Sequence, residues 1–274
     1  MRRLRRLLRK RAARWSEGVF VAEGLSVVRS ALAAGVPVES LYLAAGSALA
    51  ADVATIAEAA RAVGARIYEL APGVLERVAD TVTPQPVLAV VPMAAGDLEA
   101  LAGGRLVVVM AGVRDPGNAG TVLRSADAAG ADGVVCCGST VDPYNPKTVR
   151  SSAGSLFHVP VVVAGGVAGT LDALRTLGYR RLGAVVQGGV DYTTVDWSPP
   201  TALVLGNEAS GLDAAARPHL DELVGVPMAG RAESLNVGVA CAVLCFEALR
   251  QRRAAAGGDA GSTMPGVTTR RDPA

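Results

Sequence analysis

Three short segments in the second half of the chain hold the residue types best suited to chemistry. The first runs from Asn118 to Arg124, the second carries Glu208, and the third contains Ser234 and Asn236. The sequence has only two histidines and lacks both G-x-S-x-G and H-E-x-x-H, so the usual histidine-based catalytic and zinc patterns are missing. If the protein is an enzyme, its site is therefore built from Asn, Arg, Glu, Ser and backbone groups.

Each of these residues also has an ordinary structural interpretation. Asn118 and Ser234 are of types that cap helices. Arg124 would suit an exposed helix surface, and Glu208 the first turn of a helix, where a carboxylate favours the dipole. Asn118 and Arg124 are six residues apart, about 600° around a helix, so their side chains do not share a face. No single one of these residues indicates a functional site, but the three segments together do.

Apolar, strand-like runs that end in polar turns would position these residues. Residues 201–205 lead directly into Gly206 and Asn207, and residues 223–226 lead into Pro227. A chain with this pattern brings the end of a strand, and its backbone, close to a ligand. The second and third segments consequently predict a binding site at the ends of two strands.

The second half of the chain predicts an α/β domain with a mainly parallel sheet. Its strand-like runs are continuously apolar, which is typical of strands covered on both faces. We expect strands at 105–111, 133–137, 159–163, 181–186, 201–205 and 223–226, and helices at 118–129, 170–177, 211–217 and 235–252. The sequence contains no glycine-rich dinucleotide or P-loop fingerprint, so an ordinary Rossmann-type nucleotide site is not expected.

Residues 1–92 predict a smaller α/β domain with short connections. Strands are expected at 19–21, 41–43, 66–70 and 87–91, with helices at 24–34, at 50–63 and from Pro72 onward. The glycine-containing segment 93–104 is the expected linker to a second domain at 105–253. Residues 254–274 are rich in Gly, Ser, Pro and Arg and predict a disordered tail.

Basic charge is concentrated at the N-terminus. Residues 1–14 hold eight basic side chains and no acid, and subtracting them from the net charge of +2 leaves −6 for the remaining residues. A basic arm on a mildly acidic body predicts contact with a polyanion. The alternatives are a solvated helix start and a start-site artefact.

The cysteines and the hydropathy of the chain indicate the cellular compartment in which the protein is found. The four cysteines form no C-x-x-C and lie apart from any pair of histidines, so we expect buried thiols in a reducing compartment and no metal site. No apolar run approaches the ~18 residues of a spanning helix, and no secretory apolar region follows the basic start. The prediction is a cytoplasmic protein without membrane association, and an N-terminal transit peptide is the alternative.

Taken together, the three segments resemble the motifs of the SpoU family of RNA 2'-O-ribose methyltransferases, in the knotted SPOUT superfamily. The first motif is matched by residues 118–124. The second is matched by residues 205–208 with Gly211 and Leu212, and the third by Pro227, Met228 and residues 234–240. The match covers about residues 105–250. The N-terminal part of the chain, through residues 20–24, resembles the substrate-binding domain that rRNA-modifying members carry. This resemblance is weaker than that of the three motifs.

The resemblance implies a C-terminal α/β domain with a deep trefoil knot and a smaller N-terminal α/β domain like a ribosomal protein. It implies methyl transfer from S-adenosylmethionine to a ribose 2'-hydroxyl, with 23S rRNA preferred over tRNA as the RNA partner. A non-catalytic RNA-binding or ribosome-assembly protein on the same fold is the alternative. The family also implies a homodimer formed through the knotted domain, with the last helix in the interface.

The resemblance assigns the site residues to two tasks. Cofactor binding would fall to Leu205, Gly206, Val226, Met228 and Leu235. The reacting edge would comprise Arg124, Asn118, Glu208, Ser234 and Asn236. The resemblance points to Arg124 for activation of the hydroxyl, and RNA would be held by residues 1–14 and the first domain. Two positions depart from the family's usual residues, because Asp115 stands where Asn is common and Gly238 where Ser is common.

Overall fold

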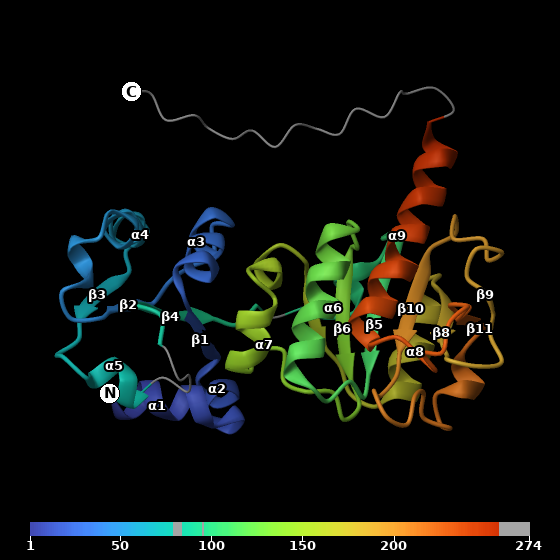
Figure 1. Ribbon diagram of the computed structural model, residues 1–274, viewed down its shortest axis with the longest axis horizontal. Helices are drawn as coiled ribbons and strands as arrows, with labels where there is room; N and C mark the ends of the chain where they lie inside the picture. The colour runs from blue at the N-terminus through green and yellow to red at the C-terminus, as the bar shows by residue number, and fades with distance from the viewer. Residues whose placement is uncertain (79–83, 95, 258–274) are drawn as a thin grey trace.

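The structure is a computed structural model of the chain and describes residues 1–78, 84–94 and 96–257. Two β-sheets with flanking helices lie side by side along the long axis of the molecule (Figure 1). The four-stranded sheet belongs to the N-terminal part and the seven-stranded sheet to the C-terminal part. Of the predicted disordered tail, residues 254–256 instead continue the last helix, and residues 258–274 lie outside the described residues.

The C-terminal sheet is parallel throughout. In the order in which they pair, its strands are β7 (Val161–Val163), β6 (Gly133–Cys137), β5 (Leu106–Ala111), β10 (Thr201–Leu205), β8 (Arg180–Ala184), β11 (Glu222–Gly225) and β9 (Val190–Asp191). Each of these pairings is parallel, which confirms the prediction drawn from the continuous apolar runs. The sequence does not predict β9, because a two-residue strand leaves no hydropathy pattern.

Both faces of this sheet are covered, as its apolar composition requires. Along β5, Leu106, Val108 and Met110 belong to one hydrophobic cluster, whereas Val107 and Val109 belong to another. The first cluster includes residues of α6 (Pro116–Ala128) and α9 (Val237–Ala256), and the second includes residues of α8 (Val167–Thr176). The helices α6 and α9 pack side by side over one face of the sheet (Figure 1).

The N-terminal sheet is smaller and mixed. Its strands pair in the order β1 (Val19–Glu23), β4 (Val87–Pro92), β2 (Ser40–Leu43) and β3 (Arg66–Glu69), and only the β2–β3 pair is parallel. One face packs against α3 (Leu25–Ala33) and α4 (Ala51–Ala62), and the other against α1 (Arg2–Arg9) and α5 (Val74–Val78). This part therefore has the alternating α/β character that its sequence predicts.

The basic N-terminal segment is folded, which corrects the prediction of an arm. It forms α1 and then α2 (Arg11–Glu17). Leu7 and Leu8 lie three and four residues after Leu4, so the three side chains share a face of α1, and all are buried against the N-terminal sheet. The segment is part of the hydrophobic core and cannot move freely.

Folding also neutralises part of the basic charge of α1 and α2. Arg3 and Arg6 pair with Glu17, at 2.6 and 2.5 Å, and Arg14 pairs with Asp142 at 2.6 Å. The exposed basic residues of this segment that form no ion pair with a described residue are Arg2, Arg5, Arg9, Lys10 and Arg11. The surface available to a polyanion is therefore smaller than the count of eight suggests.

A packed junction joins the two sheets. The helix α7 (Pro146–Ser151), which the sequence does not predict, lies between β1 and α6 (Figure 1). Both members of the Arg14–Asp142 ion pair are almost fully buried there, and Arg150 pairs with Glu23 at 2.9 Å. Since one hydrophobic cluster also runs through both parts, the two sheets are held in a defined relative position.

The structure corrects the sequence-based elements at two further places. The helix expected at 211–217 does not form, because Gly211 adopts a φ of +67° and Pro218 lacks the N–H that a helix needs; only the 3-10 turn η4 (Arg217–His219) is present there. In the expected linker, the 3-10 turn η2 (Glu99–Leu101) buries Leu101 in the core. The other 3-10 turns are η1 (Ser47–Leu49) and η3 (Ser155–Phe157).

Candidate functional site

The candidate site forms where two neighbouring parallel strands, β5 and β10, come to an end. The strands pair in register from Leu106 opposite Thr201 to Met110 opposite Leu205, so their carboxyl ends share an edge. The chain continues from β5 to β6 on one side, whereas β10 adjoins β8 on the other. Ligands of open α/β sheets bind at such a switch in strand order, outside the carboxyl ends of the strands.

The turn that follows β10 is closed tightly on itself. Asn207 and Gly211 exchange two backbone hydrogen bonds of 2.9 Å, and the Asn207 Oδ1 accepts from the backbone N–H groups of Ala209 and Ser210. A Cβ atom on Gly206 would collide with the backbone of Gly211. Only glycine therefore fits at position 206, and the polar turn is held directly over the end of the strand.

A chain of hydrogen bonds joins the three predicted segments. The Asn236 Nδ2 donates to the Asn118 Oδ1 at 2.8 Å, and the Asn118 Nδ2 donates to the Glu208 Oε1 at 3.0 Å. The backbone N–H groups of Arg114 and Asp115 donate to the two carboxylate oxygens of Glu208, at 3.1 and 3.0 Å. Three of the predicted catalytic residues thus form one connected unit.

Glu208 stands at the N-terminus of α6 and not in the first turn of a helix of its own. Burial raises the pKa of Glu208, but the hydrogen bonds from the Asn118 side chain and from the backbone of Asp115 and Arg114 outweigh burial and keep that pKa below its ordinary value. The carboxylate also faces the positive end of the α6 dipole. It is therefore suited to orienting Asn118 and poorly suited to serve as a general base near neutral pH.

Asp115 is the N-cap of α6, which places Asn118 inside the first turn. The Asp115 Oδ1 accepts from the backbone N–H of Asn118 at 2.9 Å, and its Oδ2 accepts from the Lys147 Nζ at 3.2 Å. The Asn118 N–H bond is the main cause that keeps the pKa of Asp115 low, against burial and with help from Lys147. Since Asp and Asn cap helices equally well, this departure from the family's usual residue preserves the local geometry.

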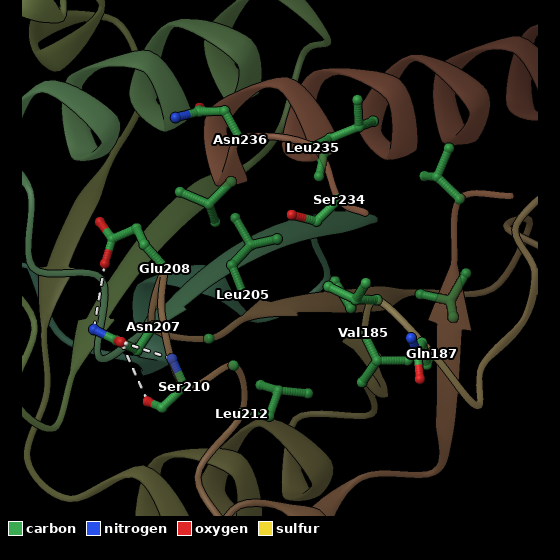
Figure 2. A pocket seen from close by; sticks show the side chains of 18 of the residues that line it. Val185, Gln187, Leu205, Asn207, Glu208, Ser210, Leu212, Ser234, Leu235 and Asn236 are labelled. Atoms are coloured by element: carbon green, nitrogen blue, oxygen red, sulfur yellow. Dashed lines mark hydrogen bonds between the residues drawn. The ribbon is translucent and has the colours of Figure 1, made fainter. Parts of the chain in front are cut away.

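A pocket of about 610 Å³ opens beside this network. In Figure 2, Leu205, Leu212 and Val185 surround the pocket, while Glu208 and Asn236 lie along one side. Its lining includes all five predicted cofactor residues, Leu205, Gly206, Val226, Met228 and Leu235, and three of the predicted catalytic residues, Glu208, Ser234 and Asn236. The combination of apolar walls with one polar edge suits a ligand that has a flat apolar portion and a reactive polar end.

The third segment reaches the pocket at the start of α9. Asn236 is the N-cap of that helix, because its Oδ1 accepts from the backbone N–H of Gly238 at 2.9 Å. Ser234 is exposed at the pocket and does not cap the helix, so the capping interpretation of Ser234 is wrong. Its hydroxyl is therefore available to a ligand.

Two predicted catalytic residues, Asn118 and Arg124, do not line this pocket; Asn118 is hydrogen-bonded to its edge, whereas Arg124 is not part of that network. Arg124 is exposed on α6 and makes no ion pair with any residue that the structure describes. Its neighbours Thr121 and Ser125 contact Gly238 of α9, so Arg124 projects beside that helix. The 600° that separate it from Asn118 on α6 account for this placement.

Three other residues at the site are not among the predicted site residues. The Asn207 Nδ2 donates to the Gly112 carbonyl at 3.1 Å and ties the two turns together. Gln187 and Arg217 line the pocket. Asn207 lies inside a recognisable motif, whereas Gln187 follows β8 and Arg217 belongs to η4, and neither is near a motif in the sequence.

Gly238 allows α9 to approach α6 closely. A Cβ atom at this position would lie 2.6 Å from the Cγ2 and 2.8 Å from the Cβ of Thr121. We therefore expect Gly238→Ser, the family's common residue, to lower the free energy of unfolding by about 1–3 kcal/mol through overpacking. Urea denaturation measures the effect, and adding Thr121→Ala should restore part of the loss. A Gly238→Ser protein as stable as the parent would show that the helices can separate without cost.

The described residues contain neither a metal-binding cluster nor a membrane-spanning helix. Within residues 1–78, 84–94 and 96–257, no group of three or more His, Cys, Asp or Glu side chains is arranged to hold a metal ion. Over the same ranges, no helix combines the length and the hydropathy that crossing a bilayer requires. All four cysteines are buried free thiols, and burial raises the pKa of Cys137 to about 11.

Comparison with known proteins covers almost the whole chain. The model of the SpoU rRNA Methylase family matches residues 105–246, and the model of the MRM3-like substrate binding domain matches residues 1–89. The chain is 37% identical, over 87% of its length and 92% of the relative's, to the 23S rRNA (guanosine(2553)-2'-O)-methyltransferase RlmP of Bacillus subtilis (strain 168). It is 36% identical, over 90% of its length and 88% of the relative's, to the 23S rRNA (uridine(2479)-2'-O)-methyltransferase of Streptomyces viridochromogenes.

Solved structures show the same architecture. The SpoU methyltransferase AviRb from Streptomyces viridochromogenes, in complex with the cofactor AdoMet, superposes with a TM-score of 0.81 at 34% identity, over 92% of this chain and 97% of that one. The AdoMet-bound rRNA methyltransferase from Sinorhizobium meliloti gives a TM-score of 0.79 at 33% identity, over 91% of this chain and 93% of that one. The likeness therefore extends across both sheets.

Proposed function

The chain belongs to the SpoU rRNA methylase family, and from this we propose that it transfers a methyl group from S-adenosylmethionine to a ribose 2'-hydroxyl of 23S rRNA. The observation that carries the proposal is the pocket at the carboxyl ends of β8, β10 and β11, with the Asn118–Glu208–Asn236 network along one side. An arrangement of this kind can hold a cofactor and present it to a polar substrate. We place the activity in the cytoplasm, where four buried free thiols would stay reduced.

The pocket fits S-adenosylmethionine in size and chemistry. Small-molecule sites span ~300–1,000 Å³, and this pocket measures about 610 Å³. Its apolar side chains would enclose the adenine ring, and the absence of a side chain at Gly206 lets the backbone of the turn come close to the end of the strand. The residues that would hold the cofactor are Leu205, Gly206, Val226, Met228 and Leu235. When bound, the cofactor supplies an electrophilic methyl group.

The reacting edge would orient the ribose and stabilise charge. A ribose hydroxyl is a weak nucleophile and must lose its proton at or before attack. An arginine guanidinium stays protonated in proteins and is not suited to take that proton, so the proposed role of Arg124 is to bind the adjacent phosphate and the oxygen that becomes negative. Asn118 and Asn236 would orient the ribose, and Glu208 would hold Asn118 in place. Ser234 would add a hydroxyl at the same edge.

The path of the chain supports a trefoil knot in the C-terminal domain. After β10 the chain makes the turn 206–211, adds β11 on the far side of β8, and then returns so that α9 packs on α6. The returning segment and the turn line the same pocket. We propose the family's knot here, within a methyltransferase domain at 105–253. Residues 1–92 would form a ribosomal-protein-like RNA-binding domain, connected by residues 93–104.

A homodimer through α9 would complete the site. Val239 and Phe246 are each 47% exposed and lie seven residues apart on α9, so they form an exposed apolar stripe on one face of that helix. Because α9 begins at the pocket, a second copy packed on this stripe would stand beside the pocket mouth. The Arg124 of the second copy, which projects beside α9, would then be close to the reacting edge of the first copy. In such a dimer each Arg124 would serve the partner's pocket, which would account for its position outside the pocket of its own chain.

The dimer is tested by breaking the apolar stripe. Replacing Val239 and Phe246 with glutamate is expected to convert a dimer into a monomer, because two charges would be desolvated in the interface. Light scattering at micromolar concentration measures the mass. Val190→Glu, which changes a 41% exposed valine at the edge strand β9, is the matched control and should stay dimeric. A parent protein that is monomeric under these conditions would contradict the proposal.

RNA binding through α1 and α2 predicts a defined salt dependence. If Arg2, Arg5, Arg9, Lys10 and Arg11, which are exposed and form no ion pair with a described residue, each neutralise a phosphate, log K should fall with log salt at a slope of roughly −3.5 to −4.5. Replacing the five with glutamine should make the slope much shallower, as measured by filter binding to an rRNA fragment. Point substitutions are preferable to deleting residues 1–14, which would also remove Leu4, Leu7 and Leu8 from the core. An unchanged slope would exclude these helices from the RNA interface.

The proposed activity is tested directly with labelled S-adenosylmethionine. The protein is incubated with total rRNA or with tRNA, and ribose methylation is mapped by nucleotide-resolved primer extension. Label at a single position of 23S rRNA is the expected result. Label in tRNA alone would favour a tRNA methyltransferase, and no label in either RNA would favour a non-catalytic RNA-binding or ribosome-assembly protein.

A further inference from the structure

An exposed tryptophan on α2 has no role in the site described above. Trp15 is 39% exposed, and the guanidinium carbon of Arg11 lies 5.6 Å from its ring centroid. The chain has only one other tryptophan, Trp197, which is fully buried. An aromatic surface of this size gains hydrophobic stabilisation when it is covered, so the exposed ring of Trp15 is a candidate contact for a ligand.

The ring of Trp15 is mounted rigidly at the junction of the two sheets. It makes an edge contact with Tyr144, with centroids 6.1 Å apart and an angle of 67° between the planes. Tyr144 is itself buried, packs against Phe20 at 4.9 Å, and donates its hydroxyl to the Ala94 carbonyl at 3.2 Å. The preceding residue, Arg14, is locked in its buried ion pair. A ring held in this way loses little conformational entropy when a ligand stacks on it.

The position of Trp15 connects the basic helices with the reacting edge. Tyr144 immediately precedes Asn145, the N-cap of α7, and Lys147 in the first turn of α7 pairs with Asp115, the N-cap of α6. A continuous set of contacts therefore leads from Trp15 to the helix end that carries Asn118. Figure 1 shows α2 beside α1 on the N-terminal side of α7, and α6 on the other side.

We propose that Trp15 and Arg11 form a stacking platform for an unpaired nucleobase of the RNA substrate, next to the target nucleotide. Unstacked bases bind on aromatic rings and on guanidinium planes alike, and both are present here. Lys10, just before α2, and Lys147, whose exposed amino group pairs with Asp115, would bind the flanking phosphates. The cations Arg11, Lys10 and Lys147 favour an anionic partner over an apolar protein surface. The inference rests on the proposed function, because it names where that function's substrate is held.

Tryptophan fluorescence tests the stacking step without any methyl transfer. The full-length protein is titrated with a ten-nucleotide oligoadenylate and with an abasic oligoribonucleotide of the same length and charge. Adenylate is expected to quench the emission of Trp15, whereas the abasic strand, which has phosphates but no bases, is not. Trp15→Phe should abolish the quench and leave the emission of buried Trp197 unchanged. Equal quenching by both strands, or binding of adenylate without any quench, would overturn the proposal.

Variants extend the test to the rRNA substrate. Trp15→Ala is expected to weaken binding of the rRNA fragment by about 5- to 150-fold, with Trp15→Phe between Trp15→Ala and the parent. Tyr68→Ala, which removes another exposed aromatic residue of the same domain, should bind like the parent. Unaltered binding by Trp15→Ala, or a change in oligomeric mass instead of RNA affinity, would assign the ring to another role. If the parent methylates rRNA without stacking on Trp15, only this inference fails; if it methylates no RNA, the proposed function fails.

Discussion

Replacing Arg124 with alanine is expected to lower the rate of methyl transfer by about 10²- to 10³-fold, the usual cost of removing one group that stabilises negative charge in a transition state. Binding of S-adenosylmethionine should be unchanged, because Arg124 does not line the pocket. Arg124→Lys should recover part of the rate, since it restores a cation without the planar fork that binds phosphate. Single-turnover kinetics with the rRNA fragment, together with calorimetric titration of the cofactor, separate these effects.

The controls for Arg124 address its position as well as its charge. Arg175→Ala removes an exposed arginine from α8, on the other face of the sheet, and should leave the rate unchanged. If Arg124 acts in the partner's pocket, mixing Arg124→Ala with a cofactor-deficient Gly206→Ala protein should restore activity, because one of the two sites in each mixed dimer is then intact. No recovery would mean that Arg124 acts within its own chain. An Arg124→Ala protein that binds RNA normally and works at the parent rate would exclude the residue from catalysis.

Asp142→Ala is expected to lower the free energy of unfolding by about 3–5 kcal/mol, because it leaves the buried guanidinium of Arg14 without its counter-charge. Both side chains are almost fully buried, and the Arg14 Nε and Nη2 both donate to the same Asp142 oxygen, at 3.0 and 2.6 Å. Since the pair joins α2 to the loop after β6, its loss should also loosen the junction between the two sheets. Urea unfolding measures the first effect, and amide hydrogen exchange at α2 and α7 measures the second.

Two comparisons separate the buried charge from the loss of contacts. The double variant Arg14→Met/Asp142→Leu removes both charges and should recover much of the stability, although the Leu7 carbonyl loses its donor from Arg14. Arg175→Ala breaks an exposed pair with Asp172 and should cost at most about 1 kcal/mol. If Asp142→Ala proved no more damaging than Arg175→Ala, the junction would not depend on the buried pair.

The parallel sheet could be predicted because its cause is local. Strands such as β5, β6 and β10 are continuous apolar runs, and a strand covered on both faces needs apolar side chains on both. The predicted helix at 211–217 fails for a related reason. The alanines of this segment favour a helix. However, Gly211 has a positive φ and exchanges two backbone hydrogen bonds with Asn207, so the start of the segment is held in a closed turn.

The basic N-terminus shows the limit of reading charge from sequence. A count of basic residues records no partners, and the acids that neutralise Arg3, Arg6 and Arg14 are Glu17, Glu39 and Asp142, the last 128 residues away from Arg14. The leucines between those arginines bind the segment into the core. The sequence therefore indicates that the surface is basic but overstates how much of it is free.

By itself, the sequence determined which residues are chemically competent and which runs form strands, since residue type and local hydropathy are properties of short segments. Only the tertiary structure decided how these residues meet. Glu208 reaches Asn118 because β10 pairs with β5, and Asn236 joins them because α9 returns to pack on α6. Strand order and helix return are decided by long-range burial, which leaves no periodic trace in any one segment. For the same reason, the exposed position of Trp15 could be seen only in the folded chain.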